Sequence, residues 1–324
     1  MPTRRKALAL VAATALSTLA AAAAFAGDGQ PVRIVVGFPP GASADAVARL
    51  VAQKMPDTLG APVIVENKPG AAGRIAIEAV KNAAPDGRTV LVTPVAMMAV
   101  FPSVYKSLRY DPVKDFAPVS QLTTYQFAVA VGPRVPAKTL GELVSWAKTH
   151  PNQANFASPA AGSLPHFMGV MFAKAAGLDM VHVAFKGFAP AVSALIGGQV
   201  PMLFGVASDF STLDKAGKLH VLATSGNKRS PLFPNVPTFN EAGYKIDANG
   251  WYAMYAPAGT PADKVGQLHK AVVAALNAPD VKARLESFGM EVAGTTPAEL
   301  AKIQKEDTAR WAPVVKASGF NPNE

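Results

Sequence analysis

The turn formed by residues 39–43 (Pro-Pro-Gly-Ala-Ser) has the residue types and spacing to hold a small anion. It follows an apolar run over residues 32–38 that predicts a buried strand, and it precedes a helical pattern over residues 44–55. Ser43 stands where a helix cap is expected. A strand, a tight turn and a helix start bring free backbone N–H groups to one point, and such points bind anions.

A second junction of the same kind occurs later in the chain. A short strand over residues 155–157 leads into a turn of small residues, 158–163, and Ser163 is a plausible cap for the helix that contains His166. Small side chains let a ligand approach the backbone closely. Each helix start is equivalent to roughly half a positive charge. Two such starts facing each other would hold carboxylates, whereas the alternative is that both are ordinary capped turns.

Other polar or aromatic residues near these turns have two readings each. His166 could donate to a ligand or brace its loop. Asp45, in the first helical turn, complements the helix dipole and favours a bracing role. Lys186 could neutralise a second carboxylate or be a solvated charge, and Asp209 could meet a ligand amine or cap the surface. Phe38 could stack on the ligand or belong to the core.

Metal and cofactor sites are not predicted. The five histidines are scattered and show no metal-ligand spacing, and the chain has no cysteine. An exported domain of this composition must therefore be held together by its core without disulfides.

The elements that position the two turns alternate between strands and helices. Residues 34–38, 63–66 and 90–93 predict strands, separated by helices over 44–55 and 73–84. This is the order of a parallel sheet covered on both faces, where ligands bind beyond the carboxyl ends of the strands. A second set of strands is predicted at 127–132, 155–157, 181–185, 202–205 and 220–224. The helices of this part are predicted at 139–149, where Thr139 opens the helix, and at 163–176 and 189–196.

The last part of the chain is predicted to return to the first unit. A strand over 251–256 is followed by helices over 261–276, 279–288 and 297–317. This last segment contains too few strands to form a domain of its own. The fold class expected is therefore α/β with two lobes. Lobe 1 comprises residues 27–124 and 254–324, lobe 2 comprises residues 125–253, and the chain crosses near Tyr125 and again near Gly250.

The N-terminus is typical of a secretory signal peptide. Arg4, Arg5 and Lys6 precede an uncharged stretch over residues 7–23, and Ala24-Phe25-Ala26 is an A-x-A site, so cleavage is expected after Ala26. The alternative is a membrane anchor helix, but the stretch is Ala-rich and short for a span. No later segment offers ~18 uninterrupted apolar residues, so the mature protein is expected to be soluble.

The charge of the chain argues against nucleic acid as a partner. Loss of three positive charges with the leader lowers the formal net charge from +9 to +6, and no Lys/Arg block of five or more occurs. The remaining bias modestly favours encounter with anionic ligands.

Short motifs in a fixed order connect this chain with a known family. They are Gly37-Phe38-Pro39-Pro40-Gly41, Val65-Glu66-Asn67-Lys68-Pro69-Gly70-Ala71-Ala72-Gly73, Ala84-Pro85-Asp86-Gly87, Gly162-Ser163-Leu164-Pro165-His166, Phe185-Lys186-Gly187, Gly197-Gly198-Gln199-Val200, Val236-Pro237-Thr238-Phe239, Glu241-Ala242-Gly243-Tyr244 and Trp251-Tyr252 through Ala256-Pro257-Ala258-Gly259-Thr260-Pro261. The chain resembles the substrate-binding proteins of tripartite tricarboxylate transporters, the Bug family.

The resemblance implies a periplasmic binding protein of the type II class, with the ligand cleft between two lobes. In this family, loops corresponding to those that begin at Phe38 and Ser158 grip a carboxylate. We expect a periplasmic monomer that needs no cofactor, is not an enzyme, and captures a mono-, di- or aromatic carboxylic acid for the membrane components of such a transporter. The expected contact residues are Phe38, Pro40, Gly41, Ala42, Ser43, Asp45, Thr93, Pro94, Val95, Ser158, Ala160, Ala161, Gly162, Ser163, His166, Lys186 and Asp209.

The chain departs from the family pattern in several places. Ala42 stands where a second glycine is common, Pro159 lacks an N–H that could donate, and Pro201 replaces a common acidic residue. Residues 93–97 (Thr-Pro-Val-Ala-Met) are more apolar than the usual hydroxyl residues. We therefore expect the distal part of the ligand to be less polar than citrate.

Two other functions remain open from the sequence. The protein could present its ligand to a membrane-bound sensor instead of a transporter, because both roles share one cleft. A hydrolase using Ser163 and His166 is the remote alternative, since the hydroxyl is expected to cap the helix and no G-x-S-x-G elbow occurs.

Overall fold

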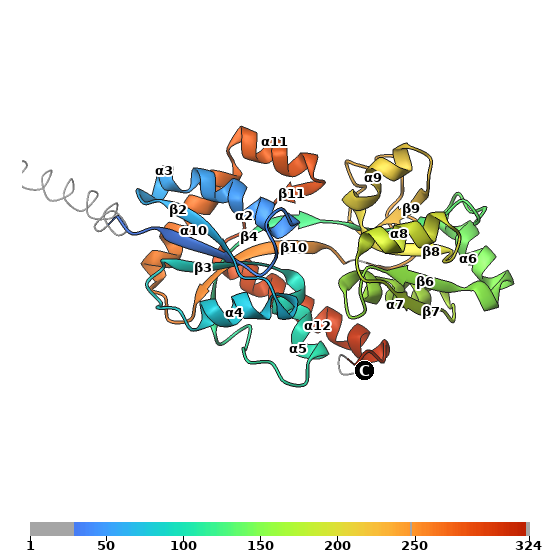
Figure 1. Ribbon diagram of the computed structural model, residues 1–324, viewed down its shortest axis with the longest axis horizontal. Helices are drawn as coiled ribbons and strands as arrows, with labels where there is room; N and C mark the ends of the chain where they lie inside the picture. The colour runs from blue at the N-terminus through green and yellow to red at the C-terminus, as the bar shows by residue number, and fades with distance from the viewer. Residues whose placement is uncertain (1–28, 247, 322–324) are drawn as a thin grey trace, which may run out of the picture.

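The chain folds into two α/β lobes, each built on one β-sheet (Figure 1). The structure, a computed structural model, describes residues 29–246 and 248–321. The predicted cleavage site after Ala26 lies outside these residues. Within the described residues, no helix is both long enough and apolar enough to cross a membrane.

Lobe 1 contains a six-stranded sheet in the order β11-β4-β10-β3-β1-β2. β1 lies between β2 and β3 and runs parallel to both, as the alternating pattern predicts. β10 pairs antiparallel with β3 and β4. The strands are β1 (Val32–Val36), β2 (Val63–Asn67), β3 (Thr89–Pro94), β4 (Phe116–Tyr125), β10 (Gly250–Pro257) and β11 (Met290–Val292).

Helices cover both faces of this sheet, and the C-terminal helices return to it as expected. α10 packs on α2 and β4, and α12 packs on β4 and the turn after β3. The helical elements of lobe 1 are α2 (Ser43–Lys54), α3 (Pro56–Leu59), η1 (Ala71–Gly73), α4 (Arg74–Lys81), η2 (Ala96–Val100), α5 (Phe101–Val104), α10 (Ala262–Leu276), α11 (Pro279–Ser287) and α12 (Pro297–Ala317).

Lobe 2 contains a five-stranded sheet in the order β7-β6-β8-β5-β9. Its α6 begins after Thr139, whose hydroxyl accepts from the Glu142 amide, as the sequence predicts. The strands are β5 (Phe127–Val131), β6 (Asn155–Ser158), β7 (Val181–Ala184), β8 (Met202–Val206) and β9 (His220–Thr224). The helical elements are α6 (Leu140–Thr149), η3 (Pro151–Gln153), α7 (Leu164–Ala176), α8 (Phe188–Ile196) and α9 (Ala207–Lys215).

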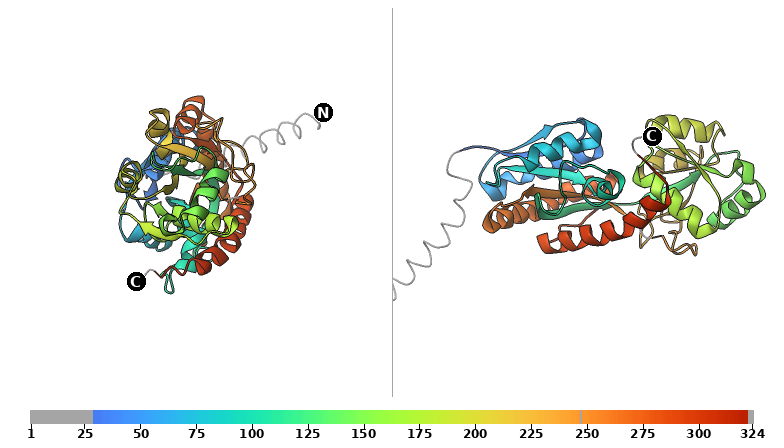
Figure 2. Two further views of the ribbon diagram at one scale, coloured as in Figure 1. Left: turned by 90° about the vertical axis from the view of Figure 1, so that its right-hand side faces the viewer. Right: turned by 90° about the horizontal axis from the view of Figure 1, so that it is seen from below.

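Two strand crossings and one helix join the lobes. The chain leaves the first sheet at the end of β4, enters the second at β5, and returns at β10, whose residues 250–253 already pair with lobe 1. The expected lobe boundary after residue 253 therefore falls inside β10, and the return lies before Gly250. The third link, which the sequence did not predict, is α12, which runs along both lobes (Figure 2).

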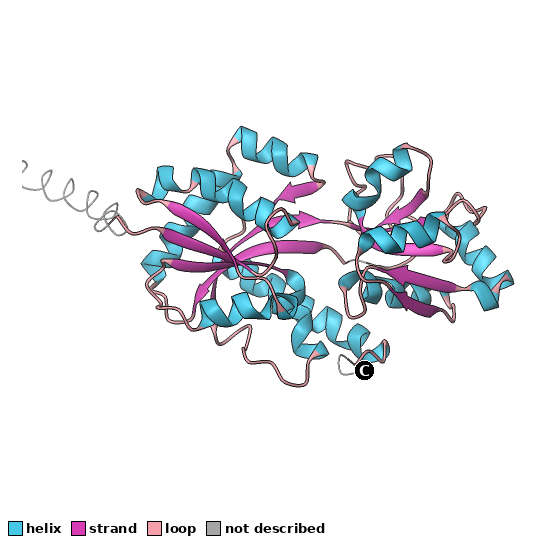
Figure 3. Ribbon diagram, viewed as in Figure 1, coloured by secondary structure: helices cyan, strands magenta, loops and turns pink. Residues whose placement is uncertain are grey.

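Several elements of the structure were absent from the sequence prediction, among them β4, the helical segment over residues 96–104, α9 and β11 (Figure 3). β4 contains Pro118 and several polar residues, so its sequence lacks a strand pattern. Its polar side chains are buried because the tertiary structure supplies partners: Ser120 Oγ donates to the Thr295 carbonyl at 2.8 Å. Pairing with β10 and β11 thus overrides local preference.

Candidate functional site

A cleft of about 390 Å³ lies between the lobes and is lined by both. Its volume is at the lower end of the range of about 300–1,000 Å³ that is usual for small-molecule sites. Lobe 1 contributes the ends of β1, β3 and β10, and lobe 2 contributes the end of β8 and the turn before α7. The lining residues are Phe38, Ala72, Pro94, Ala96, Met97, Phe101, Val104, Tyr105, Tyr125, Phe127, Ala160, Ala161, Gly162, Ser163, Leu164, Pro165, Val206, Tyr252 and Phe320.

The first loop (residues 38–43) delivers the start of α2 to the cleft. The structure corrects one detail of the sequence prediction: Ala42, in extended conformation, is the N-cap, and Ser43 is the first helical residue. No side chain caps this helix start, so its first backbone N–H groups, which lack intrahelical acceptors, remain for an external acceptor. The Ser43 side chain instead lies near the hydroxyl of the cleft residue Tyr252 and lowers its pKa, opposing the larger effect of burial.

Asp45 holds the first loop in shape. Its buried carboxylate accepts from the Gly41 amide at 2.9 Å, from Arg49 Nε at 2.9 Å and from Asn67 Nδ2 at 2.8 Å, and Asn67 also donates to the Phe38 carbonyl. Burial alone would raise the pKa of Asp45, but these hydrogen bonds lower it below its usual value. Asp45 therefore braces the loop through its side chain, as the sequence favoured. Its carboxylate is already occupied by these partners and is not expected to contact the ligand.

The second loop (residues 158–163) ends at the Ser163 cap of α7. Ser163 Oγ accepts from the His166 amide at 3.3 Å, as predicted, and donates to the Ala160 carbonyl at 2.6 Å. Gly162 has φ +70°, and an added Cβ would lie 2.4 Å from the ring of Phe320, which arrives from the end of α12. Only glycine allows this close approach of the C-terminal segment to the loop.

Two stacked histidines support the second loop from behind. The rings of His166 and His182 lie 3.7 Å apart at 11°. His166 Nδ1 accepts from the Gly162 amide at 3.1 Å, so this nitrogen carries no proton. Ser158 Oγ donates to the Ala160 carbonyl and lies 2.7 Å from His182 Nε2, so the imidazole is the donor in that pair. His166 must therefore be neutral, whereas His182 carries a proton on Nε2.

Acid is expected to destabilise this support. Burial lowers the pKa of His166 to about 4, and burial together with the charge of His166 lowers the pKa of His182 to about 4. The unfolded chain binds protons near pH 6.5, so stability falls as the pH falls from about 6.5 towards 4, by roughly 1–3 kcal/mol for each histidine. Thermal unfolding between pH 7.5 and 4.5 measures the loss.

A matched pair of variants isolates the histidine contribution. His182→Phe keeps a ring beside Phe156 and is expected to flatten the pH dependence by about half. His220→Gln, on the exposed end of β9, should leave the curve unchanged. An equal pH dependence in all three proteins would contradict the assignment.

A pair of tyrosines forms the floor of the cleft at the crossing strands. The ring centroids of Tyr125 and Tyr252 lie 5.1 Å apart, and the two hydroxyls influence each other's pKa. Burial raises the pKa of Tyr252 to about 12 and that of Tyr125 well above its usual value, so both keep their protons at neutral pH. Asp209, solvent-accessible on the first turn of α9, lies near enough to contribute electrostatically to both shifts. Desolvation by the surrounding protein raises its own pKa to about 6.

Residues 47–320 match the family described as tripartite tricarboxylate transporter family receptor. This match covers most of the chain. The chain belongs to this family.

Named relatives and solved structures agree with the assignment. Protein BugT of Bordetella pertussis is 32% identical over 298 residues, covering 90% of each chain. MatC from Rhodopseudomonas palustris with bound malate is 34% identical, with a TM-score of 0.73 over 88% of this chain and 98% of that one. R. palustris Rpa4515 with adipate is 29% identical, with a TM-score of 0.79 over 91% of this chain and 99% of that one. This receptor is therefore a periplasmic-type solute-binding protein and not an enzyme.

Six of the expected contact residues line the receptor's cleft, and one more reaches it. The lining residues are Phe38, Pro94, Ala160, Ala161, Gly162 and Ser163. Ser43 lies near the cleft residue Tyr252. The exposed or half-buried first-loop residues Pro40, Gly41 and Ala42 lie between them and are not part of the wall.

The other expected contacts are not among the lining residues of the cleft in the described part of the chain. Thr93, Val95, Ser158 and His166 are almost fully buried behind the wall. Thr93 donates to the sulfur of the cleft residue Met97, so it supports the wall indirectly. Exposed Lys186 and Asp209 are not lining residues, although Lys186 lies between two residues whose amides hydrogen bond to the second loop.

Several cleft residues were missed because they come from distant segments. Ala72, Tyr252 and Phe320 belong to three different parts of lobe 1. Ala71 and Ala72 adopt left-handed φ values of +46° and +53°, which cost of order 1–2 kcal/mol each for a residue with a Cβ. The motif Ala71-Ala72-Gly73 was noted in the sequence, but only the strained conformation marks it as part of a site.

The hydrolase alternative and a metal site lack support in the described part of the chain. The Ser163 hydroxyl donates to a backbone carbonyl, and the His166 ring faces His182 and Gly162, so no Ser–His nucleophile pair is formed. No group of three or more metal-ligating side chains occurs within residues 29–246 and 248–321.

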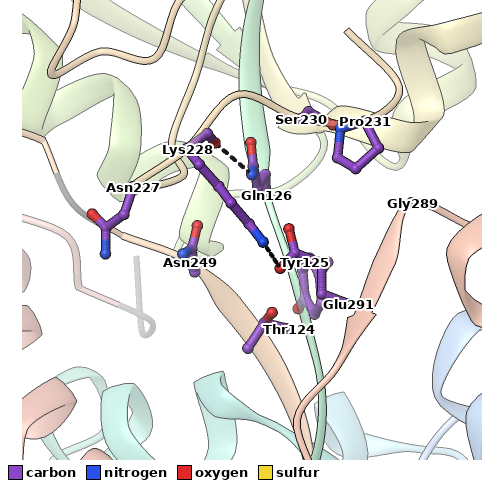
Figure 4. A pocket seen from close by; sticks show the side chains of 10 residues that line it. All are labelled: Thr124, Tyr125, Gln126, Asn227, Lys228, Ser230, Pro231, Asn249, Gly289 and Glu291. Carbon is purple, nitrogen blue, oxygen red and sulfur yellow. Dashed lines mark hydrogen bonds and ion pairs between the residues drawn. The ribbon is translucent and has the colours of Figure 1, made fainter. Parts of the chain in front are cut away.

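A second cavity, of about 430 Å³, lies at the hinge and contains an ion pair between the lobes (Figure 4). Lys228 Nζ of lobe 2 lies 2.9 Å from Glu291 Oε2 of β11 in lobe 1. Gln126 Nε2 donates to the Lys228 carbonyl at 3.0 Å, which ties the same segment to the crossing strand. This cavity contains neither loop, and its ion pair links the two lobes.

Removing this ion pair should change ligand affinity only slightly. The Lys228 side chain is 74% exposed, and exposed pairs contribute about 0–1 kcal/mol. Lys228→Gln is therefore expected to shift the Kd less than about fivefold at low salt and not at all at high salt. Lys302→Gln, which removes a pair within α12 of lobe 1, is the control and should have no effect. A change in Kd that does not depend on salt would show that the effect of Lys228 is not electrostatic.

Proposed function

We propose that this receptor captures a small carboxylate in the interlobe cleft, with the start of α2 and the second loop as its two contacts, and delivers it to the membrane components of a tripartite tricarboxylate transporter. The mature protein would act as a monomer in the periplasm after cleavage behind Ala26. No cofactor or chemical step is required, because closure needs only a difference in affinity between two arrangements of the lobes.

The uncapped start of α2 beside the cleft carries the proposal. Its N–H groups and the Ser43 hydroxyl, with the protonated hydroxyls of Tyr125 and Tyr252, form a set of neutral donors. Neutral donors bind a carboxylate without a buried ion pair, which suits reversible capture. The malate and adipate bound by two structural relatives are carboxylates, which supports the same ligand class here.

Titration calorimetry with a panel of carboxylates tests this proposal directly. At least one mono- or dicarboxylate is expected to bind the purified mature protein, and Ser43→Pro should weaken that binding by about tenfold or more. Proline is tolerated at the first helical position, and Ala42 already has the extended conformation required before proline (ψ 158°). The substitution therefore removes one N–H and one hydroxyl with little cost in folding.

Ser43→Ala is the matched control, since it removes the hydroxyl and keeps the amide. A smaller loss in Ser43→Ala than in Ser43→Pro, at equal thermal stability, assigns the difference to the backbone donor. Absence of binding to every carboxylate by a folded protein would refute the proposal. Equal affinity in both variants and the unchanged protein would place the ligand elsewhere.

A further inference from the structure

Seven of the described residues that line the cleft are aromatic, and they come from both lobes. Met97, whose side chain is almost fully buried, lies among them. A ligand that covers such a wall gains about 25 cal/mol for each Å² of apolar surface removed from water, and ring contacts add to this. The aromatic lining residues are Phe38, Phe101, Tyr105, Phe127 and Phe320, together with Tyr125 and Tyr252 of the floor.

None of the residues that line the cleft in the described part of the chain carries a charge. Arg74 lies close by, but its guanidinium stacks over the Tyr105 ring at 4.3 Å and its Nε donates to the Ala71 carbonyl. Lys186 is exposed outside the wall. One carboxylate can be compensated at the start of α2, whereas a second would lose water without meeting a cation among the lining residues.

A negative charge also lies near the floor of the cleft. Asp209 stands in the first turn of α9, three residues after the cleft residue Val206. It disfavours the ionised forms of Tyr125 and Tyr252. The same field acts on any anion placed above these rings, and like charges brought together cost binding free energy. A dicarboxylate would therefore have its second charge between an apolar wall and an acidic side chain.

We infer that the cleft selects acids with a single carboxylate and an apolar, preferably aromatic, body, and that Asp209 discriminates against dicarboxylates of the same skeleton. The inference rests on the proposed carboxylate function and narrows its ligand class. It separates this receptor from the relatives whose structures contain malate and adipate, both of which carry two carboxylates.

Calorimetric titration at pH 7.5 with matched pairs of acids provides the test. The pairs are benzoate with terephthalate and hexanoate with adipate, each with the same skeleton and one or two carboxylates. The monocarboxylate of each pair is expected to bind at least about tenfold more tightly, which corresponds to about 1.4 kcal/mol. Asp209→Asn should reduce the ratio of the dicarboxylate Kd to the monocarboxylate Kd by about threefold or more in both pairs. Asp179→Asn, which removes an exposed charge from the same lobe, should leave both ratios unchanged.

The outcomes separate this inference from the proposed function. Dicarboxylates that bind as tightly as their monocarboxylate partners overturn the inference and leave carboxylate capture intact. Ratios unchanged by Asp209→Asn overturn the role of Asp209. If none of the four acids binds, while the folded protein binds citrate or malate, the apolar ligand class is wrong; if no carboxylate binds at all, the proposed function fails with it.

Discussion

Replacing Asp45 by alanine is expected to weaken carboxylate binding by about 30-fold or more. The substitution removes the acceptor of hydrogen bonds from the Gly41 amide, Arg49 and Asn67, and hydrogen bonds to charged groups contribute about 1.5–3 kcal/mol each. The first loop would lose its shape, and the start of α2 would no longer face the cleft in one conformation. Calorimetry with the best carboxylate measures the affinity, and thermal unfolding measures the cost in stability.

A control separates bracing of the loop from the general effect of an acidic residue on the helix dipole. Asp263 occupies the first turn of α10, is exposed, and lies outside the cleft. Asp263→Ala should cost at most about 1 kcal/mol of stability and no affinity. The affinity of Asp45→Asn, which keeps one acceptor oxygen, should lie between the affinities of Asp45→Ala and Asp263→Ala. An Asp45→Ala protein with unchanged affinity would show that the first loop is not a contact.

Trp251→Phe is expected to lower the free energy of unfolding by roughly 3–4 kcal/mol. Trp251 is 2% exposed, and its Nε1 donates to Oδ2 of the buried Asp307 at 2.7 Å. Phenylalanine is smaller, so it would leave a cavity, and it would remove a donor from a buried carboxylate. Each of these two effects costs about 1–3 kcal/mol of stability. This bond fixes β10 to α12, and α12 carries Phe320 to the cleft, so affinity should fall as well. Urea unfolding followed by circular dichroism gives the free energy.

Trp311→Phe is the matched control for the loss of volume alone. Trp311 is fully buried in α12, the helix that contains Asp307, but its Nε1 has no partner among the described residues. Its replacement should therefore cost only about 1–2 kcal/mol. Equal destabilisation by the two substitutions would show that the Trp251–Asp307 hydrogen bond contributes nothing measurable.

Local pattern was sufficient where a segment's own sequence determines its structure. The apolar run over residues 32–36 and the buried β3 were predicted as strands, and Thr139 and Ser163 were predicted as caps that the structure confirms. The prediction failed for Ser43, because the neighbouring Ala42 already has the extended N-cap conformation. It also failed for α9, since no helix was predicted over residues 207–215.

The sequence by itself determined the two-lobed fold, the family and the positions of the two loops, because each depends on short segments with their own strand, turn and helix signals. Only the tertiary structure decided how the first loop is braced, that His166 stacks on His182 behind the second loop, and that Phe320 and Tyr252 enter the cleft. These features join residues far apart in the chain. Their contacts depend on how the lobes and α12 pack, and no local pattern of residue types encodes that packing.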